Sequence, residues 1–521
     1  MFSGVLTVKA ALDRACRWHS RNAALIEGER VVTYDEFAAQ CRRIANGYRK
    51  LGAVKGDRIV YLCHAGIDHA IAYYAGHYMG AITANLHFRE TARHQLELAR
   101  RLGPKFLVHD AEKRAAARQI AEALPGLQTV CLGERCDCGS ISLAELLSAP
   151  DNEPEVEVLE HDQAVIQLSS GSTGAPKALV HTHRSVLETW SGGIYMWSGI
   201  EPHDRFLNAF SPSFAVWLVH PGAFLNHGAA VVFQRRWEPG VFLQTAARFK
   251  VTCAALSAAQ WRAVLGATPE AYDLSTLRMA AYLGEKMSPE HLRELTRRIT
   301  PSFCGFYGMS ECLGLGGCVI RSSDCLKLNK WASVGKPSLN SDLRVAQPGG
   351  LARDPKGPGE VGEIVVRAAS FAIEDWGNAG WRERVLTPDG WYRTGDLGFV
   401  DQDGYVHLVG RVDSMITTGG IKVAPEEIEQ VLESHPDVAE AAVTGAADQR
   451  WGERIVAFVV ARRPGLTADE LAQWCRNGER LAGFKCPKEW VFLDRLPQNS
   501  AGKRDRRSLH QFLPELNRAG V

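Results

Sequence analysis

The sequence predicts an α/β protein of more than one domain. Apolar runs alternate with amphipathic helical patterns over residues 33–108, 205–232 and 251–306, and such alternation is typical of layered, mostly parallel sheets. Short alternating strands between residues 361 and 409 indicate a smaller β-rich subdomain. The length of 521 residues also exceeds what one hydrophobic core usually serves.

The N-terminal elements follow from the same patterns. Residues 34–51 carry apolar side chains at helical spacing and are followed by Gly52, a typical residue after a helix end. Residues 58–62 and 106–108 are expected strands. The most apolar stretch, residues 71–86, is too short and mixed to cross a bilayer, so a buried helix followed by a strand is expected there.

The C-terminal residues are expected to form a small α+β domain of their own. The boundary is placed after Arg411, which gives an N-terminal domain of residues 1–411 and a C-terminal domain of residues 412–521. A helix is expected to begin near Pro425, because proline suits the first helical position and the acidic Glu426 and Glu427 suit a helix N-terminus.

Composition limits the class of partner. Lys and Arg number 60 against 59 Asp and Glu, for a net charge of +1, which gives no support for nucleic acid or an anionic membrane as the main partner. Thirteen scattered cysteines show no disulfide framework, and Cys136 and Cys138 lack a second pair at zinc-ligand spacing. With no signal pattern at the N-terminus and no integral membrane segment, a cytoplasmic location is expected.

The most informative segment is Ser169-Ser170-Gly171-Ser172-Thr173-Gly174-Ala175-Pro176-Lys177. Its small residues let backbone N–H groups approach an anion, its hydroxyls donate hydrogen bonds, and its lysine adds positive charge, which together suit a polyphosphate. A Walker phosphate loop is disfavoured, because it needs a different spacing and leads into a helix, whereas strands are expected at 164–168 and 177–180. A flexible Ser/Gly linker is the plain alternative, which the flanking strands disfavour.

Five further segments carry side chains suited to nucleotide chemistry. They are Tyr307-Gly308-Met309-Ser310-Glu311, Trp391-Tyr392-Arg393-Thr394-Gly395-Asp396-Leu397-Gly398, Gly410-Arg411-Val412-Asp413, Thr417-Thr418-Gly419-Gly420-Ile421-Lys422 and Ser500-Ala501-Gly502-Lys503-Arg504-Asp505-Arg506. Each alone could be a turn or a solvated surface. Together, in this order, they resemble the adenylate-forming superfamily of acyl-CoA synthetases, peptide-synthetase adenylation domains and firefly luciferase. The resemblance covers nearly the whole chain and is greatest to an acyl-CoA synthetase.

This resemblance implies an ATP-dependent carboxylic acid:CoA ligase. In such enzymes a carboxylate attacks the α-phosphorus of ATP and forms an acyl-adenylate with release of pyrophosphate. A thiol, usually that of coenzyme A, then displaces AMP to form a thioester. The implied co-substrates are ATP and coenzyme A, and the implied cofactor is Mg²⁺.

The resemblance also implies the nucleotide site. The expected ATP- and AMP-binding residues are Ser169, Ser170, Gly171, Ser172, Thr173, Gly174, Lys177, Gly284, Glu285, Tyr307, Gly308, Ser310, Asp396 and Arg411. Lys177 and its loop would hold the β- and γ-phosphates, and Glu311 would bind Mg²⁺, which neutralises charge on the phosphates. Asp396 would bind the ribose hydroxyls. Ser310 stands where many relatives have threonine, and the hydroxyl is retained.

Lys503 is the implied catalytic residue of the first step. A carboxylate and an α-phosphate repel each other, and a lysine between them stabilises the charge that builds up in the transition state. The segment around it departs from the family pattern at Asn499, Ala501 and Arg504 but keeps Gly502.

The family rotates its C-terminal domain between the two steps, which implies a hinge at Asp413. The plain alternative for Asp413 is a turn aspartate. After rotation Gly419 and Gly420 would line the pantetheine channel, where a missing side chain permits close approach.

The candidate acyl pocket comprises Phe214, Ala215, Trp217, Gly305, Leu313 and Gly314. Ala215 stands where many relatives have histidine, which favours a compact or cyclic acid. Residues 312–317 are glycine-rich and uncharged, so they suit either an apolar pocket wall or ordinary packing. No Lys or Arg marks a second carboxylate, so an aryl, cyclic or medium-chain acid with an uncharged tail is expected.

Three other functions stay open. The first is an adenylation enzyme that loads a carrier protein; residues 139–143 resemble a carrier's serine motif only superficially and are better explained as a loop before a helix at 143–147. The second, a luciferase-like oxygenase, has no visible signature. The third, a non-catalytic nucleotide-binding regulator, is disfavoured because Lys177, Glu311, Asp396 and Lys503 are all present.

Overall fold

The computed structural model describes residues 5–133, 139–169, 177–284, 287–418, 421–477, 480–498 and 504–513, without the side chains of Lys422 and Arg507. The chain divides into two compact units, Met1–Leu343 with Val366–Leu386, and Arg344–Val365 with Thr387–Val521. The β-rich residues near 361–409 are therefore grouped mainly with the C-terminal part of the chain. The functional boundary at residues 411 and 412 stays a prediction.

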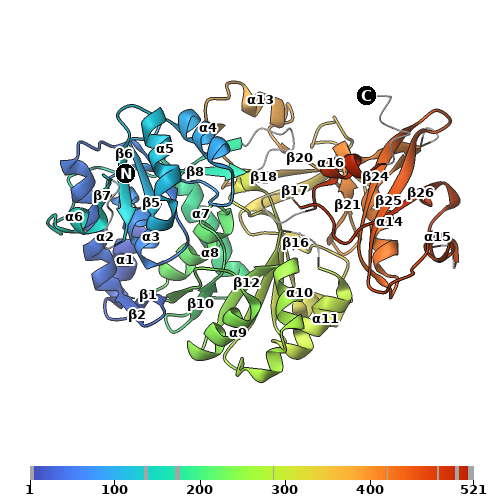
Figure 1. Ribbon diagram of the computed structural model, residues 1–521, viewed down its shortest axis with the longest axis horizontal. Coiled ribbons are helices and arrows are strands. Elements are labelled where there is room, and N and C mark those ends of the chain that lie inside the picture. The colour runs from blue at the N-terminus through green and yellow to red at the C-terminus, as the bar shows by residue number, and fades with distance from the viewer. Residues whose placement is uncertain are drawn as a thin grey trace. The chain divides into compact units, whose positions relative to one another are not determined.

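The first unit contains two large sheets (Figure 1). One has the order β19 (Glu374–Asp375), β9 (Lys177–Thr182), β8 (Gln163–Ser169), β4 (Ile82–Asn85), β3 (Arg58–Leu62), β5 (Phe106–Asp110), β6 (Gln128–Leu132) and β7 (Ile141–Ser142). The other has the order β16 (Lys336–Pro337), β15 (Gly316–Arg321), β14 (Phe303–Gly308), β13 (Met279–Leu283), β12 (Cys253–Ser257), β10 (Arg205–Asn208), β11 (Ala230–Phe233), β1 (Ala23–Glu27) and β2 (Arg30–Thr33). Both are parallel in the middle; the first becomes antiparallel at the pair β8–β9 and the second at the pair β14–β15.

Helices cover both faces of these sheets. One buried apolar cluster, here called the shared core, contains residues of both sheets, including Ile59 and Tyr61 of β3. A second cluster, called the outer core, lies on the other face of the eight-stranded sheet and includes Val60 and Leu62, as alternation along a strand requires. The helices that contribute to the shared core are α1 (Val8–His19), α2 (Tyr34–Lys50), α3 (Ile67–Tyr78), α6 (Leu143–Leu147), α7 (His183–Met196) and α8 (Ala215–Leu225). The outer core includes α4 (Ala92–Leu102) and α5 (Arg114–Ala123).

The remaining helices of the first unit are α9 (Pro239–Arg248), α10 (Ala258–Gly266), α11 (Pro289–Arg298), α12 (Ser322–Leu328) and α13 (Trp381–Val385). The expected helix at 34–51 is α2, which begins with a capping box between Thr33 and Glu36 and is followed by Gly52 at φ +85°. The apolar stretch at 71–86 forms the end of α3 and then β4, as expected. None of the described helices has both the length and the apolar character that crossing a membrane requires.

The second unit is α+β. A four-stranded sheet has the order β17 (Ser341–Ala346), β18 (Gly362–Ala368), β20 (Tyr392–Val400) and β21 (Val406–Arg411). A second sheet joins β23 (Ile421–Val423), β22 (Ile416–Thr418), β25 (Gly452–Ala461), β24 (Val438–Asp448) and β26 (Glu489–Phe492). Its helices are α14 (Pro425–Glu433), α15 (Ala468–Arg476) and α16 (Arg506–Leu509). Helix α14 begins with Pro425 as predicted and buries Ile428 and Leu432.

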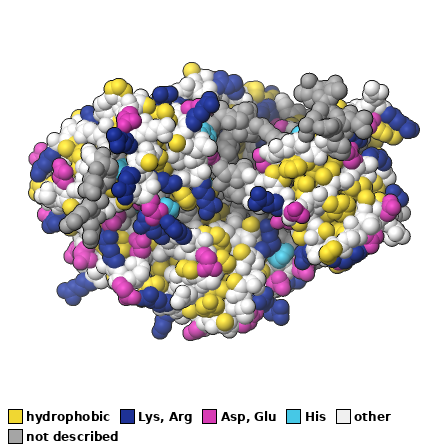
Figure 2. Space-filling view, viewed as in Figure 1, with side chains coloured by type: hydrophobic (Ala, Val, Ile, Leu, Met, Phe, Trp, Pro, Cys, Tyr) yellow, Lys and Arg dark blue, Asp and Glu magenta, His cyan; other side chains and the backbone are white. Residues whose placement is uncertain are grey.

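The surface matches the balanced composition. On the face shown in Figure 2, Lys and Arg side chains are interspersed with Asp and Glu side chains. The eleven cysteines among the described residues are buried and have free thiols; Cys136 and Cys138 lie outside that part of the chain.

Buried neutral histidines make the first unit sensitive to acid. Burial lowers the pKa of His69 and His183 to about 4, and that of His181 and His220 to about 3. In the unfolded chain these side chains accept a proton below about pH 6.5. The stability they contribute is therefore present above that pH and is lost as the pH falls, at about 1.4 kcal/mol per pH unit for each histidine.

We therefore expect the urea midpoint, followed by tryptophan fluorescence, to fall between pH 7.5 and 5.5, with most of the fall below pH 6.5. Carboxylates titrate mostly below that window, so they do not dominate the effect. A His220→Leu variant should show a shallower decline, because one titrating group has been removed. A midpoint that does not change across this window would contradict the assignment.

Candidate active site

The predicted phosphate segment connects two antiparallel strands. Strand β8 ends at Ser169 and β9 begins at Lys177, and these two residues are paired in register. Both flanking strands expected from the sequence are therefore present. A strand that returns as a strand is not the strand-to-helix turn of a Walker loop. Residues 170–176 lie outside the described part of the chain.

Lys177 forms an ion pair with Glu311. The Nζ atom of Lys177 lies 2.7 Å from Oε1 of Glu311, which is the length of a charge-assisted hydrogen bond. The Glu311 side chain is only 8% exposed and that of Lys177 is 25% exposed. Glu311 lies on a single 3₁₀ turn, Ser310–Cys312, directly after β14. The pair therefore joins the two segments that the sequence identified as most important for the phosphates.

The loop that carries Glu311 is tightly folded. Leu313 adopts φ +54° and is buried, a costly backbone conformation for a non-glycine residue that is typical of functional loops. A Cβ atom at Gly308 would lie 2.1 Å from the carbonyl oxygen of Gly314. Only glycine permits this approach, so Gly308 fixes the turn that presents Glu311.

Residues 370–372 hold this loop through hydrogen bonds to its backbone carbonyls. The backbone N–H of Ala372 donates to the Glu311 carbonyl oxygen at 2.8 Å, and the Ser370 hydroxyl donates to the Cys312 carbonyl oxygen at 3.2 Å. Buried His181, on β9, lies with Nδ1 3.2 Å from the Ser370 carbonyl oxygen; because a carbonyl only accepts, Nδ1 carries the proton. Sequence reasoning missed these supports, which have no distinctive spacing.

Three of the expected nucleotide-binding residues, Gly284, Tyr307 and Gly308, lie at strand ends of the other sheet. Tyr307 and Gly308 are the last residues of β14, and Gly284 follows β13 with φ +85°. Because β13 and β14 are adjacent and parallel, their carboxyl ends meet at one edge, where open α/β sheets bind ligands. Ser310 begins the turn that carries Glu311.

Some of the acyl-pocket candidates are close neighbours. A Cβ atom at Gly314 would lie 3.5 Å from that of Ala215, the first residue of α8. Leu313 is fully buried in the shared core, and Phe214 packs at its edge. The role of these residues in acyl binding stays a prediction.

Two other acyl-pocket candidates are enclosed by aromatic rings. Trp217 is fully buried, and its ring centroid lies 4.7 Å from that of His69 and 4.8 Å from that of Tyr73. A Cβ atom at Gly305 would lie 2.2 Å from the ring of Tyr282. Both positions are therefore tightly packed, and their role in acyl binding also stays a prediction.

In the second unit three predicted site residues are linked: Asp396 (predicted ribose ligand), Arg411 (predicted nucleotide ligand) and Asp413 (predicted hinge). Asp396 on β20 pairs in register with Arg411 on β21. The Arg411 guanidinium donates to Asp396 Oδ1 at 2.9 Å and to Asp413 Oδ1 at 3.1 Å. Burial by itself would lower the pKa of Arg411, but the two carboxylates outweigh it and raise the pKa. Arg411 therefore stays charged and connects both aspartates.

Several predicted residues lie outside the described part of the chain. They are Ser170, Gly171, Ser172, Thr173, Gly174, Glu285, Gly419, Gly420 and Lys503. Their roles stay predictions.

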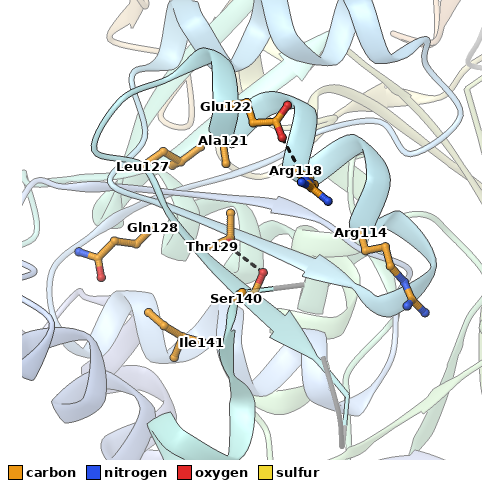
Figure 3. Close-up of a pocket in the computed structure, with 10 residues that line it drawn as sticks. Arg114, Arg118, Ala121, Glu122, Leu127, Gln128, Thr129, Ser140 and Ile141 are labelled. Carbon is orange, nitrogen blue, oxygen red and sulfur yellow. Dashed lines mark hydrogen bonds and ion pairs between the residues drawn. The ribbon is translucent and has the colours of Figure 1, made fainter. Parts of the chain in front are cut away.

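A separate pocket of about 430 Å³ lies at the edge formed by β6 and β7 (Figure 3). Arg118, which lines it, is paired with Glu122. Ser140 lies 2.7 Å from the Thr129 hydroxyl and 3.1 Å from His109 Nε2. This serine belongs to a hydrogen-bonded loop before α6, as the sequence predicted, and none of the predicted site residues lines the pocket.

Comparison with known proteins identifies the family. A model of AMP-binding enzymes matches residues 12–373, and a model of the AMP-binding enzyme C-terminal domain matches residues 427–503. The chain belongs to the AMP-binding enzyme family. The predicted adenylate-forming fold, with a large α/β part followed by a small C-terminal part, is confirmed.

Relatives at full length narrow the class. The chain is 32% identical to a feruloyl-CoA synthase of an Amycolatopsis species over 94% of this chain and 96% of the relative. It is 30% identical to a fatty acid–[acyl-carrier-protein] ligase, ScoC, of Streptomyces coeruleorubidus over 94% and 92%. Its fold matches o-succinylbenzoate CoA synthetase (MenE) of Bacillus subtilis with the acyl-adenylate intermediate, with a TM-score of 0.83, 26% identity and coverage of 96% and 97%. MenE is also known with ATP and magnesium ion. The predicted class of AMP-forming acyl-CoA ligase is confirmed.

Proposed function

We propose that this enzyme ligates a carboxylic acid with an uncharged aryl, cyclic or medium-chain tail to coenzyme A, at the expense of ATP. The observation that carries the proposal is the ion pair between Lys177 and Glu311. It brings the end of the phosphate segment and the predicted magnesium ligand, 134 positions apart in the chain, to the same point.

The donor set at this point fits Mg²⁺ held with substrate phosphates. Mg²⁺ prefers oxygen ligands and is usually bound through one or two carboxylates plus phosphate oxygens. Glu311 supplies a buried carboxylate, and Lys177 supplies a cation for the β- and γ-phosphates. Bound Mg²⁺ would neutralise charge on the pyrophosphate leaving group. In this assignment the ion pair opens when the nucleotide binds: Glu311 then binds Mg²⁺ and Lys177 binds the phosphates, while the two backbones stay in place.

The other roles follow from the family resemblance. We assign the first step to Lys503, which would stabilise negative charge between the attacking carboxylate and the α-phosphate. We assign the ribose hydroxyls to Asp396 and the domain hinge to Asp413. The contact of Arg411 with both aspartates supports a link between nucleotide binding and the hinge.

The chemistry of the acyl side favours an uncharged tail. The acyl candidates that the structure describes are apolar side chains or glycines, and Ala215 replaces the histidine of many relatives. Feruloyl-CoA synthase, by its name, acts on an aromatic acid, which favours the aryl group among the tails proposed. ScoC loads a carrier protein, so a carrier thiol is the alternative acceptor.

The test of the function is a panel of aryl, cyclic and aliphatic acids in ATP–pyrophosphate exchange, followed by CoA thioester formation. We expect exchange with at least one aryl or cyclic acid and release of AMP when CoA is added. Exchange with no acid of a broad panel would favour a nucleotide-binding regulator instead. Exchange without a CoA thioester would favour loading of a carrier protein.

Glu311→Gln tests the metal assignment. The amide keeps the side chain's shape but loses the charge, so we expect exchange to fall on the order of 100-fold and the Mg²⁺ concentration needed for half-maximal rate to rise. Asp204→Asn is the matched control, since Asp204 is a buried carboxylate 2.7 Å from Arg278 at the opposite, amino ends of the strands. An unchanged Mg²⁺ requirement in Glu311→Gln would contradict the assignment.

Two variants separate the half-reactions. Lys503→Ala should nearly abolish adenylate formation yet retain thioester formation from supplied acyl-adenylate. Equal loss of both half-reactions in this variant would refute the role of Lys503.

Asp413→Pro should retain one half-reaction at most, because proline fixes φ at the hinge. Normal rates of both half-reactions in Asp413→Pro would refute the hinge.

A further inference from the structure

One hydrogen bond of the β9–β19 ladder is replaced by a charged pair. The register pairs Glu374 with Val180 and Asp375 with Leu179, so Trp376 is opposite Ala178. The Trp376 N–H donates to the Ala178 carbonyl oxygen at 2.7 Å. In a regular antiparallel pair the Ala178 N–H would donate back to the Trp376 carbonyl oxygen. Here it donates instead to Oδ1 of the Asp375 side chain at 2.7 Å.

The Trp376 carbonyl oxygen is taken by Arg101. The Arg101 guanidinium donates to it from Nε at 3.0 Å and from Nη2 at 2.7 Å. The same Nη2 lies 2.6 Å from Asp375 Oδ1. Arg101, at the end of α4, thus donates to both acceptors: the Asp375 carboxylate, which has taken the Ala178 N–H, and the Trp376 carbonyl, which has lost it.

Asp375 is buried but fully engaged. It is 4% exposed, and its second oxygen accepts from the Asn378 amide at 2.7 Å. A buried carboxylate is costly unless it is paired and hydrogen-bonded, and this one has an arginine, a backbone N–H and a side-chain amide. Removing it would leave the Ala178 N–H and the Arg101 guanidinium without this acceptor.

The position of this pair links it to the phosphates. Ala178 directly follows Lys177, whose Nζ pairs with Glu311. Any shift of the Ala178 backbone displaces the Lys177 side chain, and a displacement of about 1 Å at a reacting group can cost on the order of 100-fold in rate. If the buried pair only stabilised the fold, its removal would not weaken ATP binding more than binding of the carboxylic acid.

We propose that Asp375, held by Arg101, is a positioning residue for ATP: it fixes the backbone after the phosphate segment so that Lys177 meets the phosphates. This inference rests on the proposed role of Lys177. It concerns two residues, 274 positions apart, that lie outside all of the segments singled out in the sequence for nucleotide chemistry.

The test compares Asp375→Ala with Asp375→Asn. We expect Asp375→Ala to speed amide hydrogen exchange at residues 177–182, to weaken ATP binding measured by calorimetry without acid, and to lower kcat/KM for ATP by about 10- to 100-fold, with the KM of the acid unchanged. Asp375→Asn keeps an acceptor for the Ala178 N–H and should lose only on the order of 5-fold.

Asp204→Ala is the matched control, because it removes a buried carboxylate that is paired with Arg278 at 2.7 Å and lies just before β10, in the sheet that does not contain Lys177. This variant should lower the melting temperature without selectively weakening ATP binding. If Asp375→Ala does not fold, Arg101→Gln and Asp375→Asn supply the same comparison. Three results would overturn the proposal: unchanged amide hydrogen exchange at residues 177–182 in Asp375→Ala, faster amide exchange there with normal ATP binding, or an equal loss of ATP binding in Asp204→Ala.

Amide hydrogen exchange and ATP binding are measured without turnover. An enzyme inactive with every acid would therefore refute the proposed function and leave this test intact.

Discussion

The ion pair between Lys177 and Glu311 sets the geometry on which the rest of the site depends. Its two residues come from different sheets, Lys177 from β9, which lies next to the edge strand β19 of the eight-stranded sheet, and Glu311 from the turn after β14 of the nine-stranded sheet. The pair, with a separation of 2.7 Å, forms only because the two sheets place Lys177 and Glu311 within reach of each other. The lysine side chain is long and flexible, so it adapts to its partner, and the two backbones decide where the pair lies.

The shared core provides the coarse placement. The same apolar cluster contains Val165 of β8 and Cys304 of β14, together with the fully buried Trp217 of α8. Because protein interiors are close-packed, strands that share one core cannot slide independently. The two sheets are thus held as one body within the first unit, and their site-bearing edges lie where their parallel order ends. The antiparallel return of β9 and β15 at these edges then leaves the strand ends available for the loops.

Sequence reasoning recovered the residues whose chemistry is local. The strands around the phosphate segment, helix α2 with its capping box, and the start of α14 at Pro425 all follow from short patterns, and the structure contains each of them. Family resemblance alone assigned Lys177 to the phosphates and Glu311 to Mg²⁺, and their ion pair was not predicted, because no short pattern shows which residues of two sheets lie together. Asp375 and Arg101 could not be found in either way. Glu374-Asp375-Trp376-Gly377-Asn378 has the composition of an ordinary turn, and the arginine that completes the pair lies on a helix at the other end of the unit's sequence.

The fixed backbone around the pair has a physical purpose in the proposed reaction. Lys177 and Glu311 neutralise each other, and a partly buried charge that loses its partner is strongly destabilising. Exchanging partners with Mg²⁺ and phosphate therefore succeeds only if the new partners occupy the same positions. This requires backbones that do not relax when the side chains separate. The Glu311 carbonyl is held by Ala372, and the Ala178 N–H is held by Asp375. Both anchors come from residues 372–375, so one short segment holds the backbone beside both residues of the proposed phosphate site.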